Sequence, residues 1–359
     1  MSRIKKLLEL LKGKDIDGML LIKDSNIRYL SGYTGTDSYI IISEKGNSFI
    51  TDARYTEQAE AECPDFEVVR WKAPALGLTE TFNVICSRHG IKKLAFEKDK
   101  VTFDLYEKLK SDLENVELIP TIGIVEGIRY VKVQAEVEHI KKAAAIADEA
   151  FNEILGYIKP GVSEKYIANE LQYIIKKKGA DDIAFSCIIA SGKNSSLPHA
   201  IPSDKLIEQG DFVTLDFGAK YKGYRSDMTR TVVVGKADDK QKEIYNIVKA
   251  AQELGVKAVK AGISGKAPDD QARNLITAAG YGPYFGHGLG HGLGLEIHEE
   301  PFLNPSCTSI LQPGNTLTIE PGIYIPGWGG VRIEDTVAVT DNGAEILTKS
   351  SKELIELEI

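Results

Sequence analysis

The sequence predicts an α+β protein with two domains: an α/β domain over residues 1–122 and a second domain over residues 123–359 that repeats one helix–helix–hairpin unit. Three observations support this prediction. Short apolar runs alternate with helical patterns at the start, one long amphipathic pattern begins after residue 122, and two later segments repeat each other. A chain of 359 residues is long enough for two separate cores.

The first domain is expected to be a sheet with covering helices. Helical spacing of apolar residues occurs at Ile4, Leu7, Leu8 and Leu11, and again at Phe103, Leu105, Tyr106 and Leu109. Five short apolar runs are predicted to be strands: 18–22, 39–42, 66–69, 93–96 and 116–119. A polar loop over residues 30–37 is expected to be either a plain connector or a cover for an active site.

The second domain begins with a helical stripe of apolar residues that runs from Val137 to Ile158. Residues 159–165 are echoed by residues 260–266, and each segment closes one helix and opens another. An offset of 104 then aligns residues 213–216 with residues 317–320. A duplicated unit of this kind predicts two halves related by a pseudo-twofold axis, with their hairpins at the shared centre.

Each predicted hairpin carries two acids in an apolar, β-branched setting. Asp227 follows Asp216 by eleven residues, and Glu334 follows Glu320 by fourteen. A loop centred on residues 221–222 would place Asp216 opposite Asp227, with Cβ atoms roughly 4.5–5.5 Å apart. A loop centred on Gly327 would place Glu320 opposite Glu334. Four carboxylates are therefore expected to crowd two apolar hairpins.

Such a cluster needs a source of positive charge or of protons. Any one acid alone could be a solvated hairpin residue, but burying four unpaired acids would cost several kcal/mol each. Either the acids take up protons or cations lie between them, and we favour cations. A glycine-rich segment, residues 286–298, adds His287, His291 and His298. Oxygen ligands with one imidazole suit Mn, Co, Fe or Zn more than a thiolate site does.

Composition excludes several other classes of partner. The net charge of −8 argues against nucleic acid, and no apolar run approaches the roughly 20 residues of a membrane span. The glycine-rich segment lacks both the second histidine of H-E-x-x-H and the G-x-G-x-x-G nucleotide pattern. Four scattered cysteines without C-x-x-C spacing indicate a reducing compartment, so we expect a cytoplasmic protein.

These residues resemble the metallopeptidase family with the pita-bread fold, which includes methionine aminopeptidase, aminopeptidase P, prolidase and the metal-free creatinase. The resemblance implies a pita-bread domain that holds two divalent metal ions, Mn or Co in preference to Zn or Fe. Its five metal-ligand positions correspond to Asp216, Asp227, His291, Glu320 and Glu334. Residues 25–33 and 51–55 are similar to the creatinase-type N-terminal domain, which points to the Xaa-Pro peptidase branch.

The resemblance further implies the cleft and the reaction. His199, His287 and His298 correspond to residues that line the substrate cleft and are expected to take part in catalysis. His287 or His298 is expected to hydrogen-bond the scissile carbonyl, and Glu320 is expected to carry the proton. Arg332 is expected either to support the metal carboxylates or to contact the substrate. The expected reaction is hydrolysis of the bond between an N-terminal residue and proline by a metal-bridging hydroxide, on proline-containing di- or oligopeptides.

Three points stay open at this level. Several prolidases carry an arginine between the third histidine and the first glutamate, and residues 304–309 offer none, so dipeptidase and longer-peptide aminopeptidase remain alternatives. A metal-free peptide-binding scaffold or a creatinase-like hydrolase is the alternative from another class. The resemblance also implies a homodimer in which the loop near Tyr33 reaches the partner's cleft.

Overall fold

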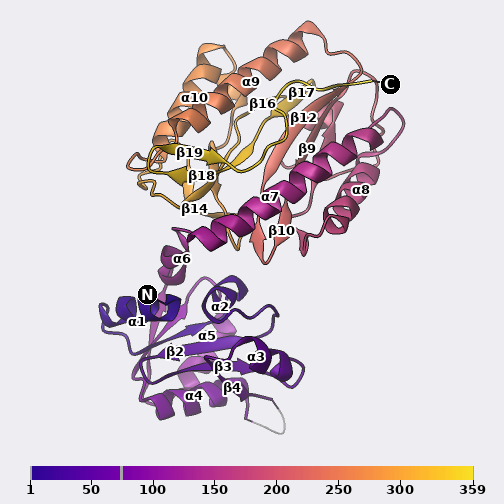
Figure 1. Cartoon of the computed structure of the whole chain (residues 1–359). Helices are drawn as coiled ribbons and strands as arrows, with labels where there is room; N and C mark the ends of the chain where they lie inside the picture. The colour runs from indigo at the N-terminus through magenta and orange to yellow at the C-terminus, as the bar shows by residue number, and fades with distance from the viewer. Residues whose placement is uncertain (1, 73–75, 359) are drawn as a thin grey trace. The chain divides into compact units, whose positions relative to one another are not determined.

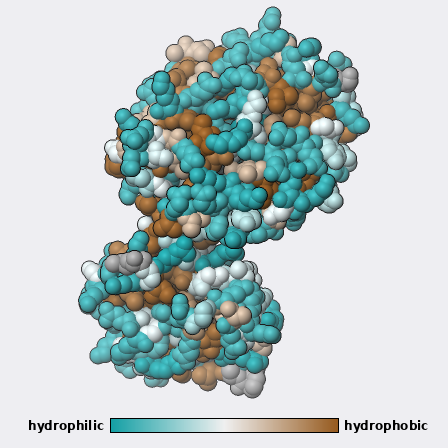
Figure 2. Space-filling model, in the orientation of Figure 1, coloured by the Kyte–Doolittle hydropathy of each residue, from teal (hydrophilic) through white to brown (hydrophobic). Residues whose placement is uncertain are grey.

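The computed structural model describes residues 2–72 and 76–358, and the chain divides into two compact units, Met1–Arg129 and Tyr130–Ile359 (Figure 1). Helix α6 (Ile124–Arg129), which follows the boundary expected at residues 122–123, lies in the first unit. None of the helices in the described part of the chain is long and apolar enough to cross a membrane. In Figure 2 the visible face of each unit is mostly hydrophilic, with scattered hydrophobic patches.

The first unit contains one mixed six-stranded sheet in the order β4-β3-β2-β1-β5-β6. Its strands are β1 (Gly18–Leu21), β2 (Tyr39–Ser43), β3 (Gly46–Thr51), β4 (Glu67–Arg70), β5 (Lys93–Glu97) and β6 (Glu117–Thr121). The five expected strands are confirmed. Strand β3 was not expected, because Gly46, Asn47 and Ser48 are weak strand formers and only the antiparallel pairing with β2 makes them extended.

The described residues of the first unit also form six helices: α1 (Arg3–Lys12), α2 (Asp24–Ser31), α3 (Thr56–Glu62), α4 (Leu78–His89), α5 (Phe103–Asp112) and α6. The two helices expected from apolar spacing are α1 and α5. Helix α2 occupies the start of the predicted polar loop and ends at Gly32, which takes a left-handed conformation with φ 85°. The core lies where α4 and α5 cover the sheet, around Leu20, Phe82 and Leu94.

The second unit is built from two similar halves. The first half contains α7 (Gln134–Ile154), the 3₁₀ turn η1 (Leu155–Tyr157), α8 (Glu164–Lys177), β7 (Asp182–Ile183), β8 (Ile188–Ser191), η2 (Gly192–Ser196), β9 (Phe212–Phe217), β10 (Ala219–Tyr221), β11 (Tyr224–Arg225) and β12 (Met228–Val234). The second half contains α9 (Asp239–Ala258), α10 (Lys266–Ala278), η3 (Gly282–Tyr284), β13 (Gly290–Gly292), β14 (Glu299–Leu303), β15 (Thr316–Ile319), β16 (Gly322–Ile325), β17 (Gly329–Arg332), β18 (Asp335–Thr340), β19 (Gly343–Ile346) and β20 (Glu356–Leu357). In Figure 1 α7 and α8 cover one half, and α9 and α10 cover the other.

The duplication is visible in matching turns. Gly161 and Gly262 end the first helix region of each half with φ values of 88° and 84°. Isolated bridges then join Ser163 to Leu206 in one half and Ser264 to Ile310 in the other. These paired features confirm the pseudo-twofold relation expected from the repeat, and the architecture agrees with the pita-bread fold that the resemblance implies.

The two central sheets have the strand orders β20-β12-β9-β8 and β14-β13-β15-β18-β19, and two smaller sheets join β11-β10-β7 and β16-β17. Successive side chains of a strand point to opposite faces. On β9, Val213, Leu215 and Phe217 are fully buried in the hydrophobic core beside α7 and α8. Asp216 therefore points away from that core, on the face where the site is built.

The hairpin registers confirm one expectation and correct another. Strand β16 pairs with β17, and β15 pairs with β18, in the register predicted from a loop centred on Gly327. In the other hairpin Asp216 lies opposite Thr229 and not opposite Asp227, so the prediction was wrong by two residues. The turn is centred on Lys222 and Gly223, which both take positive φ of 49° and 84° as a two-residue hairpin loop requires. A shift of two keeps Asp227 on the same face as Asp216.

Candidate metal centre

Five potential ligands lie around one cavity of about 290 Å³ in the second unit. Asp216 is near the end of β9 and His291 is the middle residue of β13. Asp227 and Glu334 immediately precede β12 and β18, and Glu320 immediately follows β15. The ends of four strands and the middle of a fifth thus direct these side chains to a common space.

The imidazole of His291 faces the acids. Its Nε2 lies 3.6 Å from Oδ2 of Asp227 and 3.4 Å from Oε1 of Glu320. Asp227, His291 and Glu334 each offer a ligand atom within 4.8 Å of the others. Nδ1 of His291 lies 3.0 Å from the carbonyl oxygen of Gly292, which assigns the proton to Nδ1 and leaves the Nε2 lone pair directed at the acids. Burial lowers the pKa of His291, so the neutral ligand form is favoured.

The carboxylates repel one another. Burial raises the pKa of Asp227 and of Glu334 well above the ordinary range, and the charges of the neighbouring acids raise both further. Burial also raises the pKa of Glu320. Within the described residues, Oδ1 of Asp216 and Oδ1 of Asp227 are buried and have no hydrogen-bond partner. Such orphaned carboxylate oxygens beside a neutral imidazole fit divalent cations, which would satisfy the oxygens and remove the repulsion.

An arginine beneath the acids holds two of them in place. Nη2 of Arg332 lies 2.6 Å from Oδ2 of Asp216, and its Nε donates to Oγ1 of Thr229 at 3.0 Å. Thr229 in turn donates to Oε2 of Glu334 at 2.7 Å. The Arg332 side chain is only 4% exposed. Its guanidinium is therefore paired within the protein, with Asp216 directly and with Glu334 through Thr229.

Tyr324 connects Arg332 to the first histidine of the cleft. Its hydroxyl accepts from Nη1 of Arg332 at 3.0 Å and lies 2.9 Å from Nε2 of His287. Burial raises the pKa of Tyr324 to about 12, so the hydroxyl keeps its proton and donates it to His287. Nδ1 of His287 lies 2.7 Å from the carbonyl oxygen of Gly288. Both nitrogens of His287 are thus engaged within the protein.

The other two expected histidines differ from His287. His199 and His298 line the same cavity, and both side chains are exposed. Within the described residues neither makes a hydrogen bond, although the His298 ring lies edge-on to His291 with centroids 4.4 Å apart. Burial lowers the pKa of His298. These two imidazoles are therefore the ones available to a ligand in the cavity.

The glycines around His291 let neighbouring strands approach closely. A Cβ at Gly290 would lie 2.0 Å from the carbonyl oxygen of Thr318, and one at Gly292 would lie 2.4 Å from that of Glu300. Any side chain at either position would push β13 away from β15 or β14. The glycine-rich pattern is thus a packing requirement of the strand that carries the imidazole.

A buried glutamate holds the loop that carries His199. Glu164 is fully buried at the start of α8 and accepts from the backbone nitrogens of Ser191 and Ser203, at 2.7 and 3.0 Å. It also accepts from the hydroxyls of both serines and from the amide of Asn194. His199 therefore sits on a loop fastened at both ends.

The residues that the sequence analysis missed are mostly neutral. Thr229 and Tyr324 carry hydroxyls, which do not stand out in apolar strands. Thr318, whose Oγ1 lies 3.1 Å from Oε1 of Glu320, was also missed. A signal existed for Thr318, because the offset of 104 aligns it with Thr214 on the face that carries the acids.

Comparisons with known proteins agree with this geometry. The family described as metallopeptidase family M24 matches residues 138–341, and the creatinase/prolidase N-terminal domain matches residues 3–131. An Xaa-Pro dipeptidase of Pyrococcus horikoshii is 41% identical over 99% of both chains. The structure of an Xaa-Pro dipeptidase from Bacillus anthracis is similar with TM-score 0.95 and 49% identity over 99% of both chains. That of an X-Pro aminopeptidase from Thermotoga maritima has TM-score 0.91 and 40% identity over 99% of this chain and 100% of its own. The chain belongs to metallopeptidase family M24 and carries a creatinase/prolidase-type N-terminal domain.

Proposed function

We propose that the protein is a dinuclear metal-dependent exopeptidase that hydrolyses the bond between an N-terminal residue and proline. The observation that carries the proposal is the set of buried acids in which two carboxylate oxygens lack partners while a neutral imidazole faces them. The names of the relatives, Xaa-Pro dipeptidase and X-Pro aminopeptidase, support the choice of substrate.

Asp216, Asp227, His291, Glu320 and Glu334 would hold two divalent ions. When bound, such ions lower the pKa of a water molecule from 15.7 to about 7 and so supply a nucleophile at neutral pH. Glu320 would accept the proton of that water and pass it to the proline nitrogen that leaves.

His298 and His199 would bind the scissile carbonyl. Both are free to donate a hydrogen bond, and a donor aimed at the developing negative charge on oxygen stabilises the transition state. His287 lines the same cavity, and we assign it to the cavity wall because its two nitrogens are already engaged. Arg332 is assigned to holding Asp216, because its guanidinium is already paired with that carboxylate.

Part of the cavity lining is apolar and suits a proline ring. This part includes Phe185, Ile188, Pro198, Ile297 and Phe302. Proline offers no amide hydrogen to recognise, so selection has to come from contacts with the ring. An apolar lining of this kind supports a preference for proline over a polar residue after the scissile bond.

The finer assignments are part of the same proposal. Oxygen-rich ligation supports Mn²⁺ or Co²⁺, with Zn²⁺ or Fe²⁺ as alternatives. The four cysteines, all buried and free, support a cytoplasmic location. A homodimer that acts on proline-containing di- or oligopeptides, without nucleic-acid or membrane partners, completes the proposal; light scattering tests the dimer.

The proposed function is tested with purified protein that has been stripped of metal and reloaded with Mn²⁺ or Co²⁺. The loaded protein is expected to cleave Ala-Pro or Ala-Pro-Ala peptides, and Asp227→Asn is expected to lose both activity and bound metal. Asp341→Asn, which alters an exposed acid in the same unit, is the matched control. Full activity in the presence of a strong chelator, or no bound metal in active protein, would overturn the proposal.

A further inference from the structure

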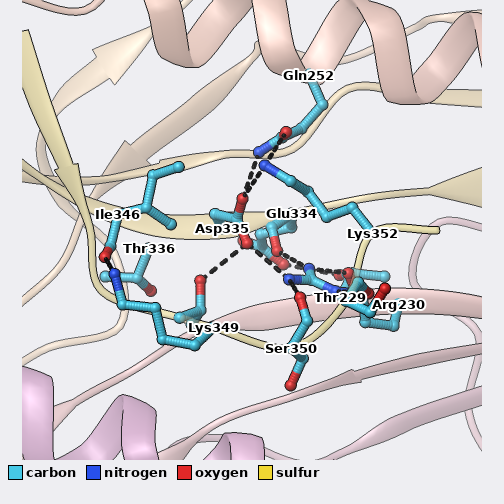
Figure 3. A network of polar contacts seen from close by, with 12 residues as sticks. Thr229, Arg230, Gln252, Glu334, Asp335, Thr336, Ile346, Lys349, Ser350 and Lys352 are labelled. Carbon is cyan, nitrogen blue, oxygen red and sulfur yellow. Dashed lines mark hydrogen bonds and ion pairs between the residues drawn. The ribbon is translucent and has the colours of Figure 1, made fainter.

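A second polar network lies beside the metal centre and contains a fully buried ion pair that the proposed reaction does not use (Figure 3). Nη2 of Arg230 lies 2.7 Å from Oδ1 of Asp335, and both side chains are 1% exposed. Arg230 is three residues after Asp227 on β12, and Asp335 directly follows Glu334 on β18. The pair therefore joins the β9–β12 ribbon, which carries Asp216 and Asp227, to the β15–β18 ribbon, which carries Glu320 and Glu334.

The guanidinium of Arg230 has a partner for each of its five N–H groups. Nε donates to the carbonyl oxygen of Ser351 at 3.0 Å, and the two hydrogens of Nη2 go to Asp335 and to the carbonyl oxygen of Ser350 at 2.8 Å. Nη1 donates to the carbonyl oxygens of Thr229, at 2.9 Å, and of Glu334. A lysine ammonium has three donors on one atom and cannot reach five acceptors placed around a planar fork.

Asp335 is bound as completely from the other side. Oδ1 accepts from Arg230 and from Oγ1 of Thr348 at 2.9 Å. Oδ2 accepts from Nε2 of Gln252 on α9 at 2.9 Å and from Nζ of Lys352 at 2.7 Å. Figure 3 shows Gln252 and Lys352 converging on this carboxylate from outside the ribbons. The network thus reaches from both ribbons to α9 and to the segment of residues 348–352.

The contacts of this network bear directly on two proposed metal ligands. Nη1 of Arg230 bridges the carbonyl oxygens of Thr229 and Glu334, and the Glu334 backbone nitrogen donates to the Thr229 carbonyl oxygen at 3.1 Å. On the other ribbon, Oγ1 of Thr336 accepts from the Asp227 backbone nitrogen at 3.1 Å and donates to its carbonyl oxygen at 2.7 Å. The backbones of Asp227 and Glu334 are therefore held at a set spacing by side chains of the opposite ribbon.

We propose that Arg230 and Asp335 are positioning residues of the metal centre, which hold the strands that follow Asp227 and Glu334 together so that both carboxylates can bind metal. The inference rests on the proposed function, because it assumes that these acids bind metal. Neither side chain lines the cavity, so the pair acts through the backbone of its neighbours and not through contact with substrate. Residues outside the ligand set that orient ligands alter metal affinity by about 10- to 100-fold when they are changed.

The test compares Arg230→Lys and Asp335→Asn with a variant that only loosens the core. Ile175→Ala removes part of a fully buried apolar side chain on α8, outside both networks, and serves as that control. Chelator-stripped protein is titrated with Mn²⁺ by calorimetry, its metal content is measured after gel filtration, and kcat and KM are determined for an Xaa-Pro peptide. Lys352→Met, which leaves the Arg230–Asp335 pair intact, is the milder second variant.

We expect Arg230→Lys and Asp335→Asn to bind the second Mn²⁺ about 10- to 100-fold more weakly and to lose kcat with little change in KM. Ile175→Ala is expected to keep two tightly bound ions and the wild-type kcat, even though it melts at a lower temperature. Lys352→Met is expected to show a smaller loss in the same direction and serves if the stronger variants do not fold. Two-ion binding of wild-type affinity in the folded variants would overturn the inference and leave the proposed function intact. Failure of the wild-type protein to bind metal would instead overturn the proposed function.

Discussion

Replacement of Thr229 by valine tests whether one hydroxyl links the arginine to the acids. Thr229 is fully buried, its Oγ1 accepts from Nε of Arg332 at 3.0 Å and it donates to Oε2 of Glu334 at 2.7 Å. Valine has nearly the same shape, so the substitution removes both hydrogen bonds and leaves almost no cavity. The Nε donor of Arg332 would then stay buried without a partner.

The size of the effect follows from these two contacts. A hydrogen bond to a charged group contributes about 1.5–3 kcal/mol, and two bonds that share one hydroxyl do not add fully. We therefore expect Thr229→Val to lower the free energy of unfolding by about 2–4 kcal/mol. Thr229→Ser keeps the hydroxyl and loses one methyl group, at a cost of about 1 kcal/mol. Metal affinity should fall about 10- to 100-fold in the valine variant and stay near wild type in the serine variant.

The assay is urea unfolding followed by tryptophan fluorescence. The chain has two tryptophans, and Trp71→Phe leaves Trp328 as a reporter of the second unit alone. Calorimetric titration with Mn²⁺ measures the affinity in the same background. If the valine variant is within about 0.5 kcal/mol of its parent, or if serine and valine are equally destabilised, the hydroxyl does not act as this link.

Three further predictions follow from the site and can be measured in the same way. Removal of metal by chelator should lower the melting temperature of the second unit by about 5–10 °C, because ions at 100 times their Kd add about 2.7 kcal/mol; calorimetry checks this, and an unchanged melting temperature contradicts it. Among the described residues that line the cavity, Arg332 is the one lysine or arginine, and it is paired with Asp216. The carboxylate of a dipeptide would therefore find no free cation, so Xaa-Pro-Xaa tripeptides should be cleaved faster than Xaa-Pro dipeptides. In the Asn304→Arg variant the ratio of kcat/KM for tripeptides to kcat/KM for dipeptides should fall about fivefold, as expected for an exposed ion pair of about 1 kcal/mol between the new arginine and the dipeptide carboxylate. An unchanged ratio would refute the explanation by charge. Glu164→Gln should destabilise the protein by about 1–3 kcal/mol and lower kcat more than it raises KM, because the loop that positions His199 for the scissile carbonyl loses an acceptor; a rise in KM with unchanged kcat would argue against a role of His199 in the transition state.

The carboxylates stood out in the sequence because charges in the middle of apolar, β-branched runs are unusual, and the histidines were identified from a glycine-rich segment and from a family resemblance. The pairing of the second hairpin was also predictable, since an odd loop centred on Gly327, with φ 75°, leaves a single symmetric register. The first hairpin was misplaced by two residues because two turns of even length were possible. The choice between them depended on Lys222 taking a left-handed conformation beside Gly223.

The contacts that hold the ligands were harder to predict. Thr229 and Tyr324 are neutral, and their importance comes from partners more than 100 residues away or across a turn. Arg230 and Asp335 are charged, but their pairing depends on how the two halves meet, which hydrophobic periodicity within either half does not determine. Local patterns therefore predict the elements and the ligands, while the supporting network is a property of the assembled halves.

The ion pair between Arg230 and Asp335 has a consequence for the duplicated architecture. Arg230 lies opposite Leu215, and Asp335 lies opposite Ile319, and the offset of 104 relates Leu215 to Ile319. The arginine and the aspartate thus occupy the same position in the two repeats. Two copies of either repeat, assembled about the same axis, would bury arginine against arginine or aspartate against aspartate, at a cost of several kcal/mol. The buried ion pair needs an arginine from one half and an aspartate from the other, so two copies of a single repeat could not form it.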